Sequence, residues 1–575
     1  MRPTPPAVRR LGACAVAALL AGCFSSSDGN SPPLDTLYFP VGLSVFGDGQ
    51  YLAVANSDYD LRYNAGTLLV LDLEQIRAHT PLPCSSDADC GAASRCDVSS
   101  PDGNGGHTPS YVCVDREGEN AGQPCRGLPE RAFADRLLYP GRCEYLDLVG
   151  AGLLRDGVRT VAFATDVLYR ERPPAIDPSN PEEVGRLFLP VRGDATLHWL
   201  SVTADGRVEC GQRGNNGRCD DYHRSGDDPD QENARDLRLD PEPFALAASA
   251  NGEAIAVSNR TSGRVSLFVN DWASAPKLKS VLTGLPAFPV GLATLPPPAF
   301  ATAKVGLGEL GADTEYAPGF LVTFSNFPEV HLLRYFENGT NPEEPYLALA
   351  NRSGIYINSS GYDSRGLDVD ETLRRGIESE CDVRYGVPTG CFNDDACSAA
   401  LRDAFASDEP RKTGYLGCLN AASSTPVDVY VANRSPASLL VGRTRPVLNS
   451  VETSEVPEFH DTIPLTLGPS RVLSGDVVVG LGPDGSKIYE PRVFAVCFDS
   501  ERIFVYDPAR RRLETEIATG RGPHAIALDR EHGLLYVAHF TDSYVGVISI
   551  DRRHPITYGK TLATIGQPTP PRTSK

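Results

Sequence analysis

Short hydrophobic runs, separated by small polar turns, recur along the chain and predict many β-strands. The clearest copy is GRGPHAIALDREHGLLYVAHFTDSYVGVISID at residues 520–551, which holds three such runs at 524–528, 534–539 and 545–550. Gly533 interrupts the first connection, and a Thr-Asp-Ser turn interrupts the second. A repeated unit of strands and turns is typical of propellers and solenoids.

Six other segments follow the same template. In the closest copies a proline starts the unit, an apolar run ends in Asn, and a turn of small residues leads to a second apolar run. These close copies are residues 40–72, 243–269 and 426–442. Looser copies lie at residues 185–206, 289–335 and 475–506. Together with residues 520–551 they predict seven blades within residues 36–568.

The turn chemistry and the positions of the prolines favour an all-β protein. A proline that precedes a strand owes no ladder hydrogen bond, and Asp-Gly or Asn-Gly pairs supply the positive φ that tight hairpins need. These pairs are Asp48-Gly49, Asn251-Gly252 and Asp484-Gly485. Radial closure would remove exposed sheet edges, so we predict a β-propeller, with seven blades. A β-sandwich with additional loops is the alternative, but it would not need the same unit at both ends of the chain.

The repeat resembles the YVTN-type β-propeller repeat, whose pattern is roughly G-x-x-P-x-x-I-A-x-x-P-D-G-x-x-L-Y-V-A-N followed by a V-x-V-I-D strand. Residues 520–551 carry the closest match, although residues 529–533 replace the usual Pro-Asp-Gly turn. The resemblance implies a lactonase-like propeller scaffold. It also brings in a hydrolase as an alternative function, because some lactonases share this repeat pattern.

The N-terminus is predicted to direct export and lipidation. Residues 1–22 combine basic residues with an apolar core at 11–20, which is too short to span a bilayer but suits a signal peptide. The following LAGC sequence looks like the lipobox of bacterial lipoproteins, with Cys23 as the lipid acceptor and residues 23–35 as a tether. An ordinary secretory signal is the alternative. The lipobox predicts a lipid-anchored protein of the bacterial cell envelope, at the outer membrane.

The chain is acidic, with 54 Lys and Arg residues against 74 Asp and Glu residues and a formal net charge of −20 at pH 7. A surface of this charge repels the phosphates of nucleic acids and anionic lipid headgroups. We therefore expect no nucleic-acid partner, and we expect membrane attachment through the lipid at Cys23.

Twelve of the 15 cysteines fall into three even-numbered clusters and are predicted to form disulfides. The clusters are Cys84, Cys90, Cys96, Cys113, Cys125 and Cys143; Cys210 and Cys219; and Cys381, Cys391, Cys397 and Cys418. Zinc is the competing interpretation, but the spacing lacks the close C-x2-C pairs of zinc ribbons. The pairing within the six-cysteine cluster stays open. Cys497 stands alone in a strand pattern and is predicted to be a buried free thiol.

Two clusters lie in segments that interrupt the propeller pattern. Residues 84–143 have little apolar content and are predicted to be a disulfide-rich insert that relies on its own bridges rather than on contacts with the blades. Residues 364–420 are predicted to be a helical insert, because apolar residues recur every four positions in two stripes. The stripes are Val369, Leu373, Ile377 and Cys381, and Cys397, Leu401 and Phe405. Asp368 and Glu371 are placed like a capping box.

No motif of catalytic or metal chemistry occurs in the chain, so we predict no catalytic residue, metal or cofactor. The acidic run at residues 227–232 lacks the alternating spacing of calcium loops and is predicted to be a solvated loop. His524 and His539 belong to the clearest repeat, and His524 precedes an innermost strand. Both are therefore candidates for a site at the channel mouth. The alternative is that each histidine is hydrogen-bonded within its blade.

These features predict a non-catalytic envelope protein that binds a protein or a glycan, because loops on rigid scaffolds carry function. One alternative is a propeller hydrolase or lactonase with its site at the central channel, which rests on analogy of fold. Another is an assembly scaffold of the outer envelope. Acids and histidines that converge at the channel mouth would favour the enzyme, whereas an apolar or aromatic mouth would favour a binding protein.

Overall fold

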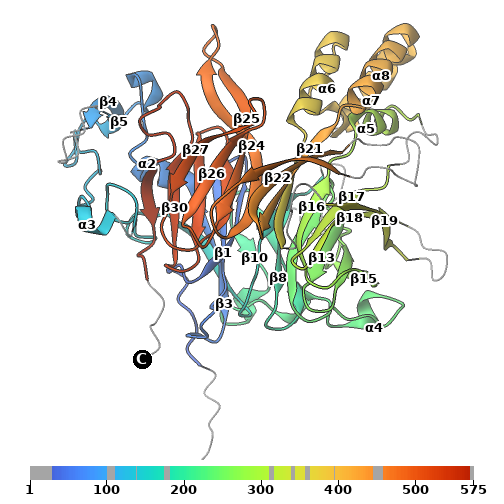
Figure 1. Ribbon diagram of the computed structural model, residues 1–575, viewed down its shortest axis with the longest axis horizontal. Helices are drawn as coiled ribbons and strands as arrows, with labels where there is room; N and C mark the ends of the chain where they lie inside the picture. Colours follow the sequence, from blue (N-terminus) through green and yellow to red (C-terminus); the bar gives the residue numbers. More distant parts are fainter. Residues whose placement is uncertain are drawn as a thin grey trace, which may run out of the picture.

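The computed structural model describes residues 29–99, 110–136, 139–173, 182–309, 316–337, 344–355, 363–393, 395–444 and 457–569. Seven antiparallel sheets of four or five strands follow one another along the chain (Figure 1). The innermost strands of successive sheets contact one another, and the innermost strand of the last sheet contacts that of the first. The chain is a seven-bladed β-propeller. The predicted signal peptide at residues 1–22 and the lipid acceptor Cys23 lie outside the described residues.

The first four blades follow one another along the chain with the inner strand first, and blade 1 is interrupted by β4 (Ser94–Ser99) and β5 (Ser110–Asp115), which pair with each other. Blade 1 contains β1 (Pro40–Phe46), β2 (Tyr51–Asn56), β3 (Gly66–Asp72) and β6 (Leu154–Thr160). Blade 2 contains β7 (Leu168–Glu171), β8 (Glu183–Val191), β9 (Thr196–Thr203), β10 (Val208–Glu209) and β11 (Arg224–Ser225). Blade 3 contains β12 (Pro243–Ala248), β13 (Ala254–Asn259), β14 (Arg264–Val269) and β15 (Lys277–Leu282). Blade 4 contains β16 (Pro289–Leu295), β17 (Gly319–Phe324), β18 (Phe327–Phe336) and β19 (Tyr346–Gly354).

The remaining three blades have the same construction. Blade 5 contains β20 (Ser364–Asp370), β21 (Val427–Arg434), β22 (Ala437–Thr444) and β23 (Glu458–Pro464). Blade 6 contains β24 (Pro469–Leu481), β25 (Lys487–Cys497), β26 (Arg502–Asp507) and β27 (Arg512–Ala518). Blade 7 contains β28 (Pro523–Asp529), β29 (Leu534–His539), β30 (Tyr544–Ser549) and β31 (Thr561–Ile565). Each of the seven predicted repeat units falls in a different blade, so the predicted blade number is confirmed.

Glycines let the inner strands approach one another closely around the channel. A Cβ atom at Gly366 of β20 would lie 2.7 Å from the Cα atom of Arg471 in β24. A Cβ atom at Gly42 of β1 would lie 2.6 Å from the backbone nitrogen of Val167. Both distances are shorter than atoms tolerate, so these positions require a residue without a side chain.

Most of the helices and the larger connections gather on one side of the propeller, whereas one short helix, Pro229–Glu232, lies at the opposite side, at the lower right of Figure 1. The helices are α2 (Leu73–His79), α3 (Phe133–Arg136), α4 (Pro229–Glu232), α5 (Ala299–Gly306), α6 (Thr372–Tyr385), α7 (Asp395–Ala406) and α8 (Glu409–Ser423), with short 3-10 turns η1 (Asp87–Asp89), η2 (Gln212–Gly214), η3 (Asp221–His223) and η4 (Cys391–Asn393). Because the strands of a blade are antiparallel, the first and third strands end on the same side. The Cys-rich insert follows β3, α5 follows β16, α6 to α8 follow β20, and a long hairpin joins β24 to β25. All of them therefore lie on one side, the insert face, along the upper edge of Figure 1.

Six disulfides join the twelve cysteines that were predicted to be bridged, each within its own cluster. The pairs are Cys84–Cys96, Cys90–Cys113, Cys125–Cys143, Cys210–Cys219, Cys381–Cys418 and Cys391–Cys397. The sulfur atoms of Cys84, Cys90 and Cys113 lie within 4.8 Å of one another because two bridges pack side by side, not because free thiolates converge on a metal. Cys497 is a buried free thiol, and burial raises its pKa to about 11.

The predicted capping box is wrong and the first helical stripe is only partly right, since Ile377 and Cys381 lie in α6 and pack in the core of the helices but the other two members do not. Asp368 and Val369 lie in strand β20, where the Asp368 carboxylate accepts hydrogen bonds from the backbone N–H and the hydroxyl of Ser474, at 2.6 and 2.8 Å. The helix begins only at Thr372, and Leu373 is 64% exposed. Pairing with β21 therefore overrides the helical periodicity at this boundary. The second stripe is confirmed, since Leu401 and Phe405 are buried in α7 within a core shared by the four helices α5 to α8.

The Cys-rich insert also differs from expectation, because it packs against the last blade. Leu146, which follows the insert, bridges to Ile565 at the outer edge of blade 7, with backbone hydrogen bonds of 2.7 and 2.9 Å. The buried Arg131 donates from Nη2 to the hydroxyl of Thr564 at 2.9 Å. We call residues 84–146 the clasp, because this segment follows a strand of blade 1 and packs against blade 7.

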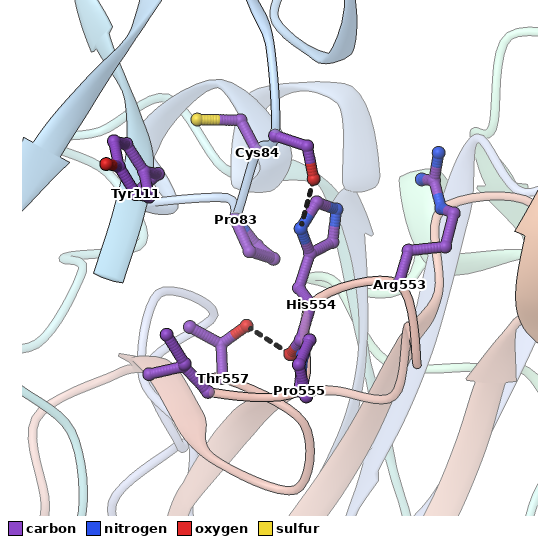
Figure 2. A pocket seen from close by; sticks show the side chains of 9 residues that line it. Pro83, Cys84, Tyr111, Arg553, His554, Pro555 and Thr557 are labelled. Atoms are coloured by element: carbon purple, nitrogen blue, oxygen red, sulfur yellow. Dashed lines mark hydrogen bonds between the residues drawn. The ribbon is translucent and has the colours of Figure 1, made fainter. Parts of the chain in front are cut away.

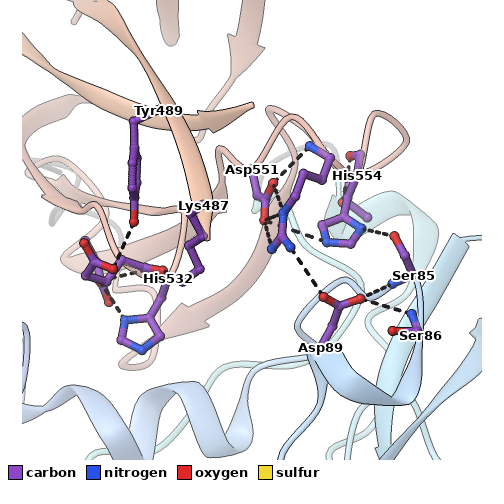
Figure 3. Close-up of polar contacts among 12 residues, drawn as sticks. Ser85, Ser86, Asp89, Lys487, Tyr489, His532, Asp551 and His554 are labelled. Atoms are coloured by element: carbon purple, nitrogen blue, oxygen red, sulfur yellow. Dashed lines mark hydrogen bonds and ion pairs between the residues drawn. The ribbon is translucent and has the colours of Figure 1, made fainter. Parts of the chain in front are cut away.

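Polar contacts extend the clasp along the loop that precedes β31. Asp89 pairs with Arg553 at 3.4 Å, and the hydroxyl of Ser85 lies 3.3 Å from Nδ1 of His554 (Figure 3). Beside the clasp, Arg77 of α2 pairs with the buried Asp529 of β28 at 3.0 Å. No blade mixes strands from the two ends of the chain, so these contacts contribute to closing the propeller ring.

The described part of the predicted tether, from Gly29 onward, already packs on the propeller. The carbonyl of the buried Pro32 accepts a hydrogen bond from Nε of Arg159 at 3.0 Å, and the backbone N–H of Asn64 donates to the carbonyl of Asn30 at 3.0 Å. The chain therefore reaches blade 1 before residue 35, which shortens any tether to the residues before Gly29. Within the described ranges, no helix has the length and apolar content to cross a membrane.

Candidate functional site

The side opposite the insert face is where the inner strands begin, and we call it the mouth face. In all seven blades a backbone N–H at the end of the second strand donates to the carbonyl of a residue near the start of the blade, at 2.7 to 3.0 Å. The acceptor immediately precedes the inner strand except in blade 2, where Phe163 lies ahead of β7. The seven donor residues form what we call the mouth ring: Ser57, Arg192, Arg260, Ser325, Arg434, Phe498 and Phe540. One repeated backbone hydrogen bond thus places seven side chains around the channel opening.

The residue that accepts this hydrogen bond has a left-handed backbone in six of the seven blades. The residues are Phe39, Phe163, Glu242, Phe288, Gly468 and Gly522, with φ between 51° and 84°. A bulky non-glycine residue rarely adopts positive φ, and such a conformation persists only where the surroundings fix it. The ring hydrogen bond supplies that constraint, so phenylalanine rings are held at the mouth at the cost of local strain.

The mouth ring is asymmetric in chemistry. Its three arginines belong to blades 2, 3 and 5, whereas its two phenylalanines belong to blades 6 and 7. Tyr59, which is 56% exposed, extends the aromatic side, because its ring centroid lies 5.4 Å from that of Phe540 and 6.3 Å from that of Phe163. One side of the opening is therefore rich in guanidinium groups and the other in aromatic rings.

Inside the ring lies a cavity of about 540 Å³ that is lined from all seven blades. A second cavity of about 530 Å³ adjoins it and is lined by Tyr59, Phe163, Arg192, Gly193 and Glu242. Tyr59 and Arg192 line both cavities. Volumes of this size suit small organic ligands, so the mouth offers a concave site rather than a flat surface.

An ion pair crosses the channel below the mouth. Asp166 of blade 2 accepts both Nη1 and Nη2 of Arg471 from blade 6, at 3.1 and 2.9 Å. The other inner strands carry only glycine or alanine at the same position, namely Gly42, Ala245, Gly291, Gly366 and Ala525. The next position is apolar in every blade: Leu43, Val167, Leu246, Leu292, Leu367, Val472 and Ile526. The site therefore has a charged floor above an apolar layer.

The arginines at the mouth differ in how they are neutralised. Arg192 pairs with Glu242 at 2.5 Å, yet its buried Nε has no hydrogen-bond partner. Arg434 pairs with Asp499, which is half-exposed. Arg260 has no ion pair among the described residues, and its guanidinium lies 5.5 Å from the ring centroid of Phe244. Unused donors are thus concentrated at blades 2 and 3.

Of the two predicted histidines, only His524 lines the channel. Its Nδ1 lies 3.0 Å from the carbonyl oxygen of Val41, and burial together with the charge of Arg471 lowers its pKa to about 4, so the ring is neutral at neutral pH. His539 does not line the channel. It is buried in β29 and stacks on Tyr544 with a centroid separation of 4.1 Å, and burial lowers its pKa to about 3.

The sequence contained a signal for the ring that the search for catalytic motifs missed. Four of the seven ring residues follow the Asn or His that ends a repeat strand, as Arg260 follows VSN, Arg434 follows VAN and Phe540 follows VAH. The acidic run at residues 227–232 is also less solvated than expected. Glu232 is buried, and its carboxylate accepts the backbone N–H groups of Gly226 and Leu278 at 2.7 and 3.0 Å, which is a structural role.

A smaller cavity of about 250 Å³ lies on the clasp, between Pro83, Cys84 and Tyr111 on one side and His554 and Ile556 on the other (Figure 2). His554 is buried there beside Ser85, and burial lowers its pKa. This cavity lies on the packing surface between the clasp and blade 7. The channel mouth, which is larger and carries unused donors, is the better candidate site.

Comparison with solved structures finds distant likenesses. A candidate 6-phosphogluconolactonase from Bacteroides uniformis is 11% identical, with 86% of this chain and 89% of that chain covered and a TM-score of 0.35. A second candidate 6-phosphogluconolactonase, from Bacteroides fragilis, is 9% identical, with 84% and 86% covered and a TM-score of 0.37. No protein-family model and no curated protein matches the chain. Likenesses this distant carry no argument about activity, and the fold rests on the seven sheets themselves.

Proposed function

We propose that this protein is a non-catalytic binding protein of the bacterial cell envelope that takes its ligand, a glycan or a protein end, at the mouth of its propeller channel. The observation that carries the proposal is the mouth ring, where the same backbone hydrogen bond in seven blades presents three arginines and two phenylalanines around a cavity. Function concentrates on loops held by a rigid scaffold, and this ring is such a set of loops.

Binding is favoured over hydrolysis because the one carboxylate that lines the cavity in the described part of the chain is already engaged. Asp166 is the only carboxylate among the described residues that line the 540 Å³ cavity, and both of its oxygens bind Arg471. His524 is the only histidine there, and its Nδ1 already has the Val41 carbonyl as its partner. A neutral His524 that donates from Nδ1 keeps a lone pair on Nε2, but the one carboxylate of the cavity is bound to Arg471, so among the described lining residues no free carboxylate is left to act with the histidine as a matched acid and base.

The anchor that we propose at Cys23 would orient the mouth toward the membrane. Gly29 contacts Asn64, which lies in the turn between β2 and β3 on the mouth face. Six residue steps separate Cys23 from Gly29, a reach of roughly 20 Å when fully extended. The mouth would then lie close to the lipid surface, and the clasp and the helical insert would point away from it.

The test is ligand capture by the full chain, solubilised from membranes, with envelope glycan and peptide mixtures as ligands. We expect a double variant, Tyr59→Ala with Arg260→Glu, to lose the captured ligand. The control is Tyr222→Ala with Arg213→Glu, since Tyr222 is 57% exposed and Arg213 is 80% exposed, both away from the mouth. Equal capture by both variants would reject the mouth as the binding site.

A hydrolase remains the second candidate because the cavity holds His524, which is neutral at neutral pH, beside an arginine and a carboxylate. A hydrolase would convert its ligand, and His524→Ala would abolish turnover while leaving capture intact. A binding protein would return the captured ligand unchanged in mass.

An envelope scaffold is the third candidate, and exposed apolar side chains on the insert face favour it. Leu373 and Val383 of α6 are 64% and 79% exposed, and Leu481 at the end of β24 is 50% exposed. A scaffold would retain its protein partner in the mouth double variant and lose it when these three side chains are replaced by serine.

A further inference from the structure

We propose that the ligand at the mouth is the acidic terminal sugar of a glycan, with its carboxylate held between Arg192 and Arg260 and its ring against Tyr59. This inference rests on the proposed binding function and names the ligand class. Its three parts are the pair of guanidinium groups, the exposed aromatic face and the closed floor of the cavity.

The pair of guanidinium groups is the anion-binding element. Arg192 and Arg260 occupy equivalent ring positions in adjacent blades, and Glu242 lies between them, bound to Arg192 through its side chain and to Arg260 through its carbonyl. Arg192 keeps a buried Nε without a partner, and Arg260 has no ion pair in the described part of the chain. A guanidinium has five donors in a planar fork that matches a carboxylate. The unused donors of the two residues therefore call for an oxygen-rich anion.

Tyr59 supplies the face on which a sugar ring can pack. It is more than half exposed although its neighbours in the loop are tied down. The buried Asp58 carboxylate accepts the backbone N–H of Tyr63 at 3.2 and 3.3 Å, and the Asp60 carboxylate accepts the hydroxyl of Tyr38 at 2.7 Å. A ring held in place before binding loses little entropy when the ligand arrives. Tyrosine also combines an apolar face with a polar tip, which suits a saccharide.

The floor and the donor inventory decide between a sugar and other ligands. The Asp166–Arg471 pair crosses the channel below the mouth, so a polymer can enter only by its end. A peptide C-terminus also carries a carboxylate, but its backbone N–H groups need acceptors. Arginine offers none, and Glu242 is already bound to Arg192. A sugar hydroxyl both donates and accepts, so it can turn a lone pair toward an arginine and its O–H toward water, which a peptide N–H cannot do. The donors on the arginine side of the mouth therefore suit a sugar acid better.

The experiment is titration calorimetry on the full solubilised chain with three probes. They are a trisaccharide that ends in glucuronate, the same trisaccharide ending in glucose, and a tripeptide that ends in phenylalanine with a free carboxylate. We expect the glucuronate probe to bind best. Arg260→Gln should weaken it roughly tenfold to hundredfold, since a charge-assisted hydrogen bond lost at a desolvated site has that effect. Arg260→Lys should restore part of the affinity, and Tyr59→Ala should weaken both saccharides.

Matched controls and opposing outcomes keep the proposal falsifiable. Tyr222→Ala matches Tyr59 in exposure, and Arg213→Gln changes a more exposed arginine; neither residue lines the two cavities, so both variants should bind the glucuronate probe like the parent. Melting curves should show that every variant folds. Equal binding of the glucose-ended probe would overturn the role assigned to the carboxylate, and preferential binding of the tripeptide would overturn the sugar. If no probe binds while the captured envelope ligand still depends on Tyr59 and Arg260, the acidic-sugar inference fails and the mouth remains the binding site. If capture does not depend on these residues, the proposed function itself fails.

Discussion

At the mouth face all seven blades share one backbone hydrogen bond, although the turns after the second strand differ in length, from residues 325–326 in blade 4 to residues 57–65 in blade 1. At the insert face the blades diverge: one carries the clasp, two contribute the helices α5 to α8, and one extends a long hairpin. This shared contact positions a ring of side chains accurately, since every member is fixed by the same hydrogen bond. Long connections instead bring their own cores and disulfides. The comparison suggests that precise recognition belongs to the mouth, whereas the insert face serves closure and display.

Within the insert face, the clasp and the helical insert also differ. The helices bury their own residues against one another in a separate core. The clasp contacts the last blade through Arg131, Asp89 and Ser85, and Leu146 at its end pairs with β31. The disulfides of both inserts look alike in the sequence, yet only the clasp is part of the ring closure.

The largest expected effect is therefore the loss of the clasp. Deleting residues 84–143 and joining the ends with a Gly/Ser linker should abolish the cooperative unfolding of the parent, because the contacts of Arg131 and Asp89 with blade 7 disappear and the edge strand β31 loses support. Deleting residues 372–423, which span α6 to α8, should leave one cooperative transition with a small change in midpoint. Calorimetric or urea unfolding of both deletions checks this difference. A clasp deletion that melts like the parent would show that blades 1 and 7 close on their own.

A second prediction concerns which face of the propeller points toward the membrane. We compare two variants in membranes that contain the anchored protein. The new cysteine of Val383→Cys, on the insert face, should react several-fold faster with a bulky maleimide than the new cysteine of Tyr59→Cys, at the mouth. Adding Cys23→Ser should release the protein into the soluble fraction and bring the two rates close together. Equal rates in the anchored protein would contradict the orientation, and membrane retention of the Cys23→Ser protein after a salt wash would contradict the lipid anchor.

The repeats predicted the propeller and the number of its blades because each blade is local in sequence. Apart from the insert between β3 and β6, every blade uses consecutive strands, so a pattern such as residues 520–551 already covers three of the four strands of its blade. The same locality confined each disulfide to its cluster. The sequence did not predict the clasp contacts, because Asp89 and Arg553 are far apart in the chain and only ring closure brings them together.

The candidate site was predicted less well than the fold. His524 does line the channel, but the search looked for acids and histidines and passed over the arginines that follow the repeat strands. The chemistry of a ring depends on which blades are neighbours. Arg192 and Arg260 become a pair only once blades 2 and 3 stand side by side, and one of them lies in a loosely matching repeat. His539 was misplaced because a strand-ending residue was assumed to face the channel rather than the interior of its blade.

The loop that carries Tyr59 should lower the stability of the folded protein by a measurable amount. Burial is the main cause that raises the pKa of Asp58 to about 6, above its ordinary value of 3.8. A raised pKa in the folded state means that this carboxyl favours folding at low pH and that its contribution is lost as the pH rises from about 4 through about 6. Asp58→Asn should therefore raise the free energy of unfolding at pH 7 by about 2 kcal/mol. It should leave ligand capture unchanged if the amide oxygen still accepts the Tyr63 N–H.

Urea unfolding at pH 4 and pH 7 measures this effect. The parent and the Asp58→Asn variant should have similar stability at pH 4 and diverge at pH 7. A variant that is less stable than the parent at pH 7 would show that the ionised carboxylate is needed to hold the loop. In that case Asp58 would act as an anion at the mouth and oppose acidic ligands.

The smallest expected effect is at the floor of the mouth, where Arg471 of blade 6 binds Asp166 of blade 2 across the channel. Arg471→Met removes the partner of Asp166 and should cost about 1–2 kcal/mol of stability, because a partly buried carboxylate loses a charge-assisted bidentate hydrogen bond.

The same change should raise the pKa of His524 above its value of about 4, since the positive charge of Arg471 is one cause of the lowering and Asp166 acts in the opposite sense. The pKa should stay below 6.5, because burial is the larger cause. For a histidine whose folded pKa lies below its unfolded value, stability is present above pH 6.5 and is lost as the pH falls toward the folded pKa. The variant should therefore lose less stability on acidification than the parent does, and histidine NMR titration reports the pKa directly. An unchanged His524 pKa would show that the charge of Arg471 does not influence the histidine. The lowered pKa would then be due to burial alone.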